Sequence, residues 1–389
     1  MTNILLSSTD IAECITNLIA RNKLWAGKKL KLFFVVNSKA GCFTNKKVSK
    51  QYYKLFTETN RDALESQPCA SSTNYEIFET QYQRHGEEII GHILENIFQS
   101  NNKSSTYIIV AAGGDGTSLE AQTALYNEYL KGNKENNKVL DNILVLRLPL
   151  GTGNDGTDGT FIGETFELLK SSIIYSNAKV LVTNTENDPP EESIKQASPL
   201  ISRYCDSKSK APWFSFNVAS IGIDSFVCFV TNLVKSKFPG NLYHLCIPLC
   251  GLFYDRVFKT GTAKIQMFDN LEDETPSNTF NGKIFLTVMG TSGYRTYGGG
   301  HKVLPNFNNV CIASKIPLWR VIRDNGKFAS GKHVGMDIGR MFTAEKIIID
   351  YDQPLMLQCD GECYLLCKDH FPLTVEKQNA GFKVLRRTM

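Results

Sequence analysis

Over the first 150 residues, short apolar runs alternate with segments whose apolar positions recur at helical spacing. The runs at 31–37, 75–79, 106–112 and 143–148 predict buried strands, and the segments at 46–64, 86–98 and 117–131 predict helices. Such alternation is typical of a parallel sheet with helices on both faces. We therefore expect a three-layer α/β domain over residues 1–160.

The pattern changes after residue 160. A helix is predicted at 166–175, and the polar, proline-bearing segment at 183–193 is typical of a loop or hairpin excursion. Strands dominate from residue 212, with two helices among them. The predicted strands are 213–220, 262–268, 282–290, 309–316, 345–352, 355–360 and 364–368, and the predicted helices are 225–236 and 243–257. This pattern predicts a second domain over 161–375, built mainly of antiparallel strands.

Composition excludes several classes of protein. The 389 residues are 42% hydrophobic and 21% charged, as in folded globular proteins, and 43 basic residues nearly balance 39 acidic ones. A net charge of +4 gives no indication of a nucleic-acid partner.

The longest apolar run, 243–254, contains a proline and is shorter than the roughly 20 residues that cross a bilayer. The first 23 residues resemble a capped amphipathic helix and not a signal peptide, so we expect a cytoplasmic protein.

The eleven cysteines favour reduced thiols over disulfides, because their number is odd and no export signal precedes them. Two groupings deserve comparison with zinc sites: Cys246 with Cys250, and Cys359 with Cys363 and Cys367. Neither grouping has the two-residue gap common in structural zinc sites. We interpret these cysteines as small buried apolar residues.

Glycines gather where the third predicted strand turns into a helix. Gly113, Gly114 and Gly116 remove side chains at that turn, and Thr117 begins the helix. Backbone N–H groups and the positive end of the helix dipole then suit a phosphate group. Asp115 adds a carboxylate that can act on a metal, a hydroxyl or the backbone. Taken alone, such a turn also serves as a simple tight connection.

Two further turns have the same character. The segment RLPLGTGND at 147–155 follows the next strand, and Asn37–Gly41 follows the first strand. Open α/β sheets bind ligands beyond the carboxyl ends of their strands, so all three turns are expected to converge on one crevice. No Gly-x-Gly-x-x-Gly follows the first strand, which disfavours a dinucleotide-binding dehydrogenase.

These segments together resemble the diacylglycerol kinase catalytic-domain family, which includes bacterial lipid kinases, sphingosine kinases and ceramide kinases. GGDGT alone is also similar to NAD kinase and phosphofructokinase, but six signatures in order over 31–362 are more specific. The six are Asn37–Gly41, GGDGT at 113–117 with Glu120, PLGTGND at 149–155, SFNVASIGIDSFV at 215–227, YGGGHKVLP at 297–305, and Asp360-Gly361-Glu362.

The resemblance implies a nucleotide site in the α/β domain and a C-terminal β-sandwich through which a lipid hydroxyl enters. It also implies that the tail, 376–389, returns to the first domain. Catalytic candidates are Glu362 and Asp115, and Asp155 and Asp224 would organise the metal–water network or bind the substrate head. The implied nucleotide-binding residues are Asn37, Gly41, Gly113, Gly114, Gly116, Thr117, Gly151, Thr152 and Asn154. Phosphoryl transfer needs mainly alignment and charge neutralisation, so ATP and Mg²⁺ are the expected cofactors.

The chain departs from the family pattern at three places. Ser38 stands where proline usually follows the asparagine, and GTDGT at 156–160 replaces a segment that usually begins with phenylalanine. Asn308 and Asn309 stand where the family has an acidic pair or an Asp-Gly, so the metal ligands stay open. The apolar residues of 226–234 and 242–249 are read either as an acyl-chain pocket or as ordinary core: Phe226, Phe229, Leu233, Val234, Leu242, Leu245 and Leu249.

The sequence thus predicts an ATP-dependent lipid kinase that phosphorylates a hydroxyl of diacylglycerol or a sphingoid-like lipid at a membrane surface. Two alternatives stay open. One is a kinase of a non-lipid hydroxyl, as in NAD kinase, and the other is a non-catalytic relative that binds nucleotide or lipid. A homodimer is also left open.

Overall fold

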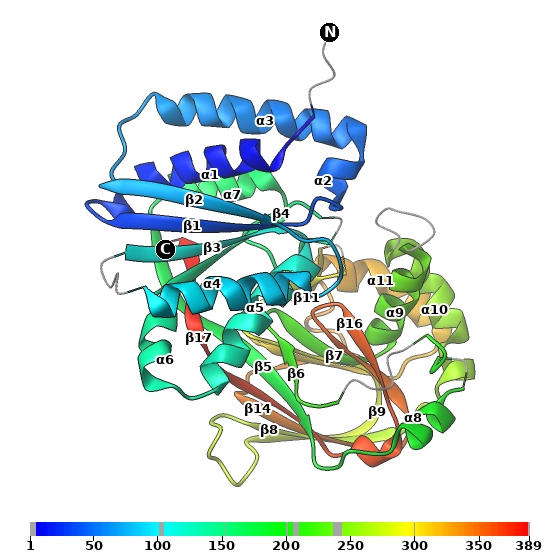
Figure 1. Ribbon diagram of the computed structural model, residues 1–389. Coiled ribbons are helices and arrows are strands. Elements are labelled where there is room, and N and C mark those ends of the chain that lie inside the picture. The colour runs from blue at the N-terminus through cyan, green and yellow to red at the C-terminus, as the bar shows by residue number, and fades with distance from the viewer. Residues whose placement is uncertain are drawn as a thin grey trace. The chain divides into compact units, whose positions relative to one another are not determined.

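The computed structural model describes residues 5–100, 105–151, 153–199, 201–204, 210–235, 243–298 and 300–387. The chain forms two compact units, Met1–Ala178 with Asn379–Met389, and Lys179–Gln378 (Figure 1). The chain passes between them within two strands, β5 (Ile173–Thr185) and β17 (Leu373–Arg387). Each unit therefore has its own core.

The first unit contains a parallel sheet in the order β17-β4-β3-β1-β2. Its other strands are β1 (Lys29–Val36), β2 (Ser72–Glu79), β3 (Ser105–Gly113) and β4 (Ile143–Pro149). The strands β3 and β4 are apolar almost throughout because both of their faces are buried, which explains their continuous apolar runs. The expected α/β architecture is confirmed.

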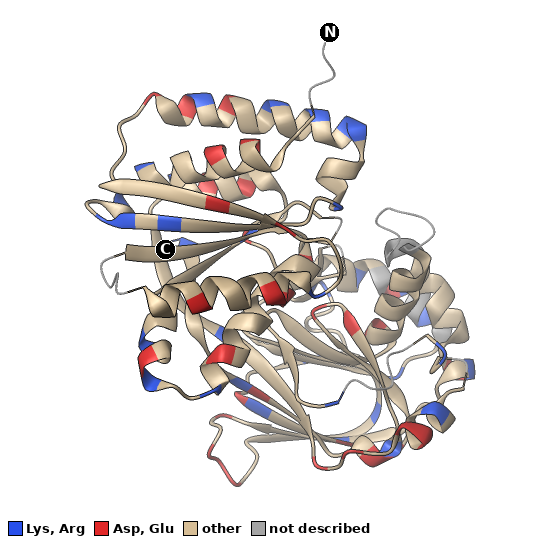
Figure 2. Cartoon of the chain, in the orientation of Figure 1, with Lys and Arg blue, Asp and Glu red and all other residues tan. Residues whose placement is uncertain are grey.

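Helices cover both faces of this sheet (Figure 1). One face carries α1 (Ser8–Arg21), α3 (Lys46–Leu64) and α7 (Ile162–Lys170), and the other carries α4 (His85–Gln99) and α5 (Asp115–Leu130). The first of these begins in a capping box, in which Ser7 and Asp10 bond each other's backbone N–H groups. Lys, Arg, Asp and Glu are interspersed along α3, in keeping with the balanced overall charge (Figure 2). Two shorter helices are α2 (Gly41–Thr44) and α6 (Lys134–Leu140).

The second unit is built on antiparallel strands, as expected. Its main path is β16-β15-β7-β9-β8-β14-β17, β12 and β13 extend it from β9, and β6 pairs with β5. These strands are β6 (Trp213–Ser215), β7 (Val218–Gly222), β8 (Thr262–Phe268), β9 (Asn278–Gly290), β12 (Val310–Ser314), β13 (Gly339–Phe342), β14 (Lys346–Tyr351), β15 (Leu355–Cys359) and β16 (Glu362–Leu366). A small separate hairpin joins β10 (Arg295–Tyr297) to β11 (His301–Leu304).

Successive residues of these strands enter two different cores. In β7, Ala219 and Ile221 lie in a core formed among the strands, whereas Val218 faces the helices. The helical core involves α9 (Ile223–Lys235), α10 (Tyr243–Val257) and α11 (Leu318–Ser330). A short α8 (Glu191–Ala197) precedes β6. This arrangement leaves room for a site between the helices and the strands.

One predicted boundary is wrong, and one helix was not predicted. The helix expected at 166–175 ends at Lys170, and Ile173–Tyr175 open β5 instead, because isoleucine and tyrosine favour strands once Ser171 ends the helix. The segment 318–330, which carried no prediction, is the helix α11. In the part of the chain that is described, no helix combines the length and the hydropathy needed to cross a membrane.

Candidate functional site

The three glycine-bearing turns of the first unit lie together. Asn37 donates its backbone N–H to Ala112 at 3.0 Å, and Leu150 donates to Gly113 at 2.7 Å. Cys42, in α2 just after the first turn, donates to Leu150 at 3.3 Å. The turns therefore meet at the carboxyl ends of β1, β3 and β4, as the topology predicted.

Two of these turns approach so closely that only glycine fits. A Cβ atom on Gly151 would lie 2.6 Å from the Cα of Gly114, and one on Gly114 would lie 3.0 Å from the carbonyl oxygen of Gly153. A Cβ on Gly113 would lie 2.2 Å from the hydroxyl oxygen of Thr117. These glycines are explained by contacts within the protein, because a side chain would push the two turns apart.

Gly116 has a different environment. A Cβ atom there would meet none of the described residues within 4 Å, and its backbone conformation is one that other residues adopt. Gly116 lies in the first turn of α5, where the N–H groups have no carbonyl partner within the helix. The open space beside Gly116 thus fits a phosphate group at the positive end of the helix. Packing within the protein gives no reason for this glycine.

Asp115 links its own turn to the turn that follows β4. Its carboxylate accepts N–H groups from Gly156 at 2.8 Å and from Asp155 at 3.2 Å, and its own N–H donates to Gly153 at 3.1 Å. Asn154 secures the same turn through its side chain, which exchanges two hydrogen bonds of 3.2 Å with the backbone of Gly151. Both oxygens of Asp115 are therefore engaged by the neighbouring turn. Its role as a base stays a prediction.

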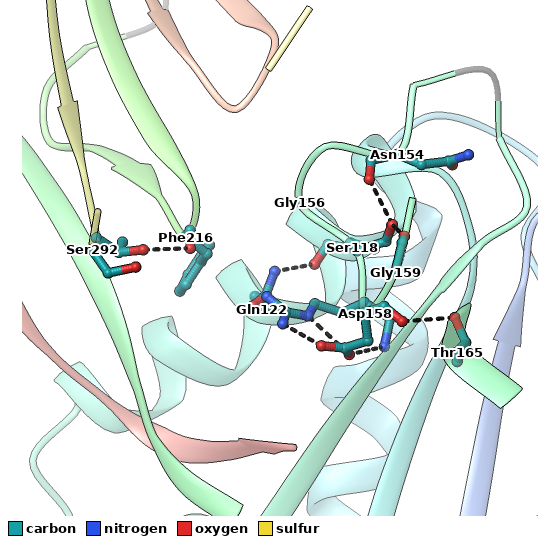
Figure 3. A network of polar contacts seen from close by, with 12 residues as sticks. Ser118, Gln122, Asn154, Gly156, Asp158, Gly159, Thr165, Phe216 and Ser292 are labelled. Carbon is teal, nitrogen blue, oxygen red and sulfur yellow. Dashed lines mark hydrogen bonds and ion pairs between the residues drawn. The ribbon is translucent and has the colours of Figure 1, made fainter. Parts of the chain in front are cut away.

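A buried ion pair closes the base of the 150–157 loop. Arg147 donates two side-chain N–H groups to Asp158, at 2.5 and 3.2 Å, and its backbone N–H also donates to that carboxylate, at 2.8 Å. Asp158 donates its backbone N–H to the carbonyl of Arg147 and accepts the hydroxyl of Thr165 at 2.7 Å (Figure 3). The GTDGT segment, which departs from the family pattern, thus supplies Asp158 for a buried clamp with Arg147 that the sequence did not predict.

The remaining signature residues of the first unit have local roles. The side chain of Asn37 accepts the N–H of Lys39 at 3.0 Å, which shapes the first turn without a proline. Gly41 begins α2, and Thr152 lies outside the described residues.

Glu120, which follows GGDGT, caps the neighbouring helix α4. Its carboxylate accepts the N–H groups of Arg84 and Gly86 at 2.9 and 3.0 Å. Burial raises the pKa of Glu120.

The second unit contains an apolar cavity with a polar end. The cavity has a volume of about 670 Å³, including its mouth. Apolar side chains from strands and helices line most of it, and Asp224, Tyr297 and His301 supply polar groups. The apolar lining includes Ile223, Val227, Ile247, Phe285, Leu286 and Phe328. A mostly apolar cavity with few polar groups is the usual form of a small-molecule site.

Asp224 is the buried centre of the polar end. It lies in the first turn of α9 and accepts the hydroxyl of Ser220 at 2.6 Å. Tyr297 also donates to this carboxylate, and its burial, together with the negative charge of Asp224, raises the pKa of Tyr297 well above its usual value. The prediction that Asp224 binds substrate stays a prediction. Tyr297, for which the sequence predicted no role, comes from β10 and lies beside Asp224 in the cavity lining.

The Asp-Gly-Glu segment forms the two-residue turn between β15 and β16. Cys359 pairs with Glu362, and the φ angles of Asp360 and Gly361 are 48° and 96°, as such turns require. Asp360 is more than a turn residue, because its carboxylate accepts N–H groups from residues 216–218 at 2.5 to 3.1 Å. Burial raises the pKa of Asp360 to about 6, although these N–H groups oppose the shift. Glu362 itself is exposed.

Asn309, which replaces an acidic residue of the family pattern, has a structural role. Its side-chain NH₂ donates to the carbonyls of Gly290 and Ala344, and its oxygen accepts the N–H of Ala344 at 3.0 Å. Asn308 accepts the hydroxyl of Thr343 at 2.9 Å. Within the described residues, no cluster of three or more His, Cys, Asp or Glu side chains could hold a metal ion.

The acyl-pocket reading of individual apolar residues is corrected in part. Phe226 and Phe229 are buried in the helical core and do not line the cavity. Leu249 is 55% exposed, because it lies on the outer face of α10. Leu233 and Val234 are half-buried on α9. Leu242 and the side chain of Leu245 lie outside the described residues.

Comparison with known proteins agrees with the early signatures. Residues 31–181 match the family model described as the diacylglycerol kinase catalytic domain. All three converging turns lie within the matched segment, which is therefore similar to a kinase domain. No curated protein matches the chain.

Solved structures show the same fold over nearly the whole chain. A structure described as that of a diacylglycerol kinase from Bacillus anthracis str. Sterne is 15% identical, with a TM-score of 0.50. A second, from the same organism and named as a candidate diacylglycerol kinase, is 17% identical, with a TM-score of 0.51. Each comparison covers 91% of this chain and 96% of the other. At these identities the likeness establishes the two-domain fold alone.

Proposed function

We propose that this chain is an ATP-dependent lipid kinase that phosphorylates a hydroxyl of diacylglycerol or a sphingoid-like lipid. The family match supports kinase chemistry. The observation that carries the lipid assignment is the cavity of the second unit, whose lining is mostly apolar and includes Asp224 and Tyr297. An apolar chain would fill such a lining, and a carboxylate at its end would accept a hydrogen bond from the head group.

The first unit supports a nucleotide role for its three turns. The open space at Gly116 and the start of α5 would receive phosphate oxygens, and Asp115 would hold the opposing turn in place. Mg²⁺, when bound, neutralises phosphate charge, and it commonly uses one or two carboxylates together with phosphate oxygens. Asp155 is the candidate for such a carboxylate. A small ligand set of this kind is compatible with the absence of an acidic cluster in the described residues.

Glu362 is the candidate base. It is exposed on β16, directly after the turn that Asp360 fixes to the backbone of residues 216–218. An exposed carboxylate on a fixed turn can take a proton from a hydroxyl late in the reaction. Asp115 is the weaker candidate, because two N–H groups of the neighbouring turn already engage its carboxylate.

The test is transfer of labelled phosphate from ATP to a panel of diacylglycerol, sphingosine, ceramide and NAD. We expect label on a lipid, and a loss of roughly 10² to 10⁴ in kcat for Glu362→Gln. Asp115→Asn serves as the comparison, with a smaller loss in kcat and a higher KM for ATP. Label on NAD alone would favour the non-lipid kinase, and nucleotide binding without turnover would favour a non-catalytic relative.

A further inference from the structure

The outer face of α10 carries large apolar side chains that the fold does not cover. Leu249, Leu252 and Phe253 are 55%, 48% and 48% exposed. Their spacing of three and four residues places them on one side of the helix. Scattered exposed leucines are ordinary, but three such residues on two successive turns form a contiguous apolar surface.

The opposite side of α10 faces the interior. Cys246, Cys250 and Tyr254 are buried in the helical core, and Ile247 lines the cavity. One helix therefore separates the cavity from the exposed apolar surface. Phe328, on the neighbouring helix α11, lines the same cavity. The two helices contact each other, so both form the wall of the cavity (Figure 1).

The segment that enters α11, a helix in contact with α10, carries further exposed apolar and basic groups. Lys315 binds Asp255, next to Arg256 at the end of α10, with 2.5 Å between the charged atoms. Four residues after Lys315, Trp319 is 59% exposed, and the guanidinium of Arg323 lies 4.8 Å from its ring centre. We define the α10–α11 face as Leu249, Leu252, Phe253, Arg256, Trp319 and Arg323.

Positive charge borders the apolar residues. The guanidinium of Arg256 lies 5.6 Å from the ring centre of Phe253. On α11, Arg320, Arg323 and Lys327 all pair with the one carboxylate of Asp324, whose side chain is fully covered. Asp337 pairs with Arg320 as well. The exposed basic groups at this rim thus exceed the acidic groups available to neutralise them.

We propose that the α10–α11 face docks on a membrane that contains anionic lipid, directly outside the substrate cavity. Leucine, phenylalanine and tryptophan would enter the boundary between head groups and acyl chains, and the arginines would contact lipid phosphates. The bordering charge favours a lipid surface over a second copy of the chain. If two copies of this face met, the basic residues of one copy would find few acidic partners on the other. The inference rests on the proposed function, since a lipid substrate must leave a bilayer to reach the cavity.

Vesicle flotation tests the docking directly and needs no kinase activity. The full chain is floated with phosphatidylcholine vesicles with and without phosphatidylserine. We expect binding that increases with phosphatidylserine. The variant Leu249→Asn/Leu252→Asn/Phe253→Ser is expected to bind roughly a hundredfold more weakly, because its apolar contacts are removed. Arg256→Gln and Arg323→Gln should each cost roughly fivefold, and only on vesicles with phosphatidylserine.

The matched control changes three exposed leucines of the first unit, in Leu55→Asn/Leu64→Asn/Leu130→Asn. It also replaces three exposed apolar side chains with polar ones and should leave vesicle binding unchanged. Thermal unfolding of both triple variants confirms that they are folded. Binding by the α10 variant that equals the parent, or an equal loss in the control, would overturn the proposal. So would a parent that is dimeric by light scattering and becomes monomeric in the α10 variant without any change in vesicle binding.

A kinase assay separates this inference from the proposed function. With a short-chain, water-soluble diacylglycerol, the α10 variant should retain the parent's rate, whereas with vesicle-borne diacylglycerol its rate should fall. Loss of both rates in a folded variant would contradict a docking role for the face. Vesicle binding through the face in a chain that phosphorylates no lipid would support docking and reject the proposed function.

Discussion

The two units build their candidate sites in opposite ways. In the first unit the site is made of backbone, with glycines packed against glycines and a carboxylate bonded to N–H groups. In the second unit it is made of side chains that come from helices and strands far apart in the sequence. A phosphate group needs donors at fixed positions, which backbone provides, whereas an apolar chain needs a shaped volume. The comparison teaches that the first unit would suit a phosphate group, whereas the second would suit an apolar ligand.

The largest expected effect tests whether the backbone site depends on its buried clamp. Asp158→Ala removes the carboxylate that pairs with the buried Arg147, so the free energy of unfolding should fall by about 3–5 kcal/mol. Urea unfolding measures the change. The double variant Arg147→Leu/Asp158→Leu is the control and should recover most of the loss. A single variant as stable as the parent would show that the loop keeps its shape without the pair.

The next effect tests whether the side-chain site acts on the lipid alone. Asp224→Ala removes the acceptor at the polar end of the cavity, and we expect kcat/KM for the lipid to fall by roughly a hundredfold. The KM for ATP should stay unchanged in the same assay. Tyr297→Phe keeps the shape and removes one hydrogen bond, so its loss should be smaller. An equal loss for ATP and lipid would break the proposed division between the units.

A pair of glycine variants distinguishes packing from ligand contact within the backbone site. Gly114→Ala forces a Cβ against the opposing turn and should cost about 1–3 kcal/mol of stability. Gly116→Ala has space for its methyl group and should leave stability within about 0.5 kcal/mol of the parent while raising the KM for ATP. Thermal unfolding and kinetics with varied ATP give both readouts. Normal ATP kinetics in Gly116→Ala would argue against a phosphate at the start of α5.

The smallest effect is a pH dependence of the second unit. The pKa of Asp360 is about 6 in the folded chain, above the value of about 3.9 in an unfolded chain. The folded state therefore keeps a proton that the unfolded state has lost, and stability should fall as pH rises from about 4 to about 6. We expect a stability change of about 1 kcal/mol, because residue Asp360 is only half-buried and solvent screening reduces the effect. The free energy of unfolding of Asp360→Asn should lack this pH dependence between about 4 and about 6. A variant whose stability changes with pH as the parent's does would contradict the role of Asp360.

The sequence predicts the first unit better than the second. Its strands are buried on both faces and its turns use glycine, so both features can be read from local composition. The clamp between Arg147 and Asp158 was missed because no local pattern connects a strand residue to a loop residue eleven positions later. Local apolar spacing predicts a helix at Ile173–Tyr175, but these residues open strand β5. The partner strands of β5 are distant in sequence, so local spacing could not indicate the strand pairing.

The cavity of the second unit could be predicted only in part. Asp224 was found through its signature, but Tyr297 and Ile247 reach the cavity through tertiary packing that no local spacing records. The exposure of Leu249 could not be predicted either, because its helical spacing is compatible with the buried or the exposed face of α10. In the fold, Leu249 lies on the exposed face. Asp360 belongs to one of the six signatures, but the sequence offers no sign that three backbone N–H groups lie opposite its carboxylate.

Strand β17 has a consequence for how the molecule is made. Its last part lies beside β4, where Lys383 pairs with Leu144, yet residues 179–378 of the other unit are synthesised between these two strands. During synthesis, one edge of β4 therefore stays unpaired until the inserted unit has emerged from the ribosome. Unpaired strand edges can pair with the wrong strand or with another chain. The first unit is thus not a contiguous fragment that can be expressed by cutting the chain once.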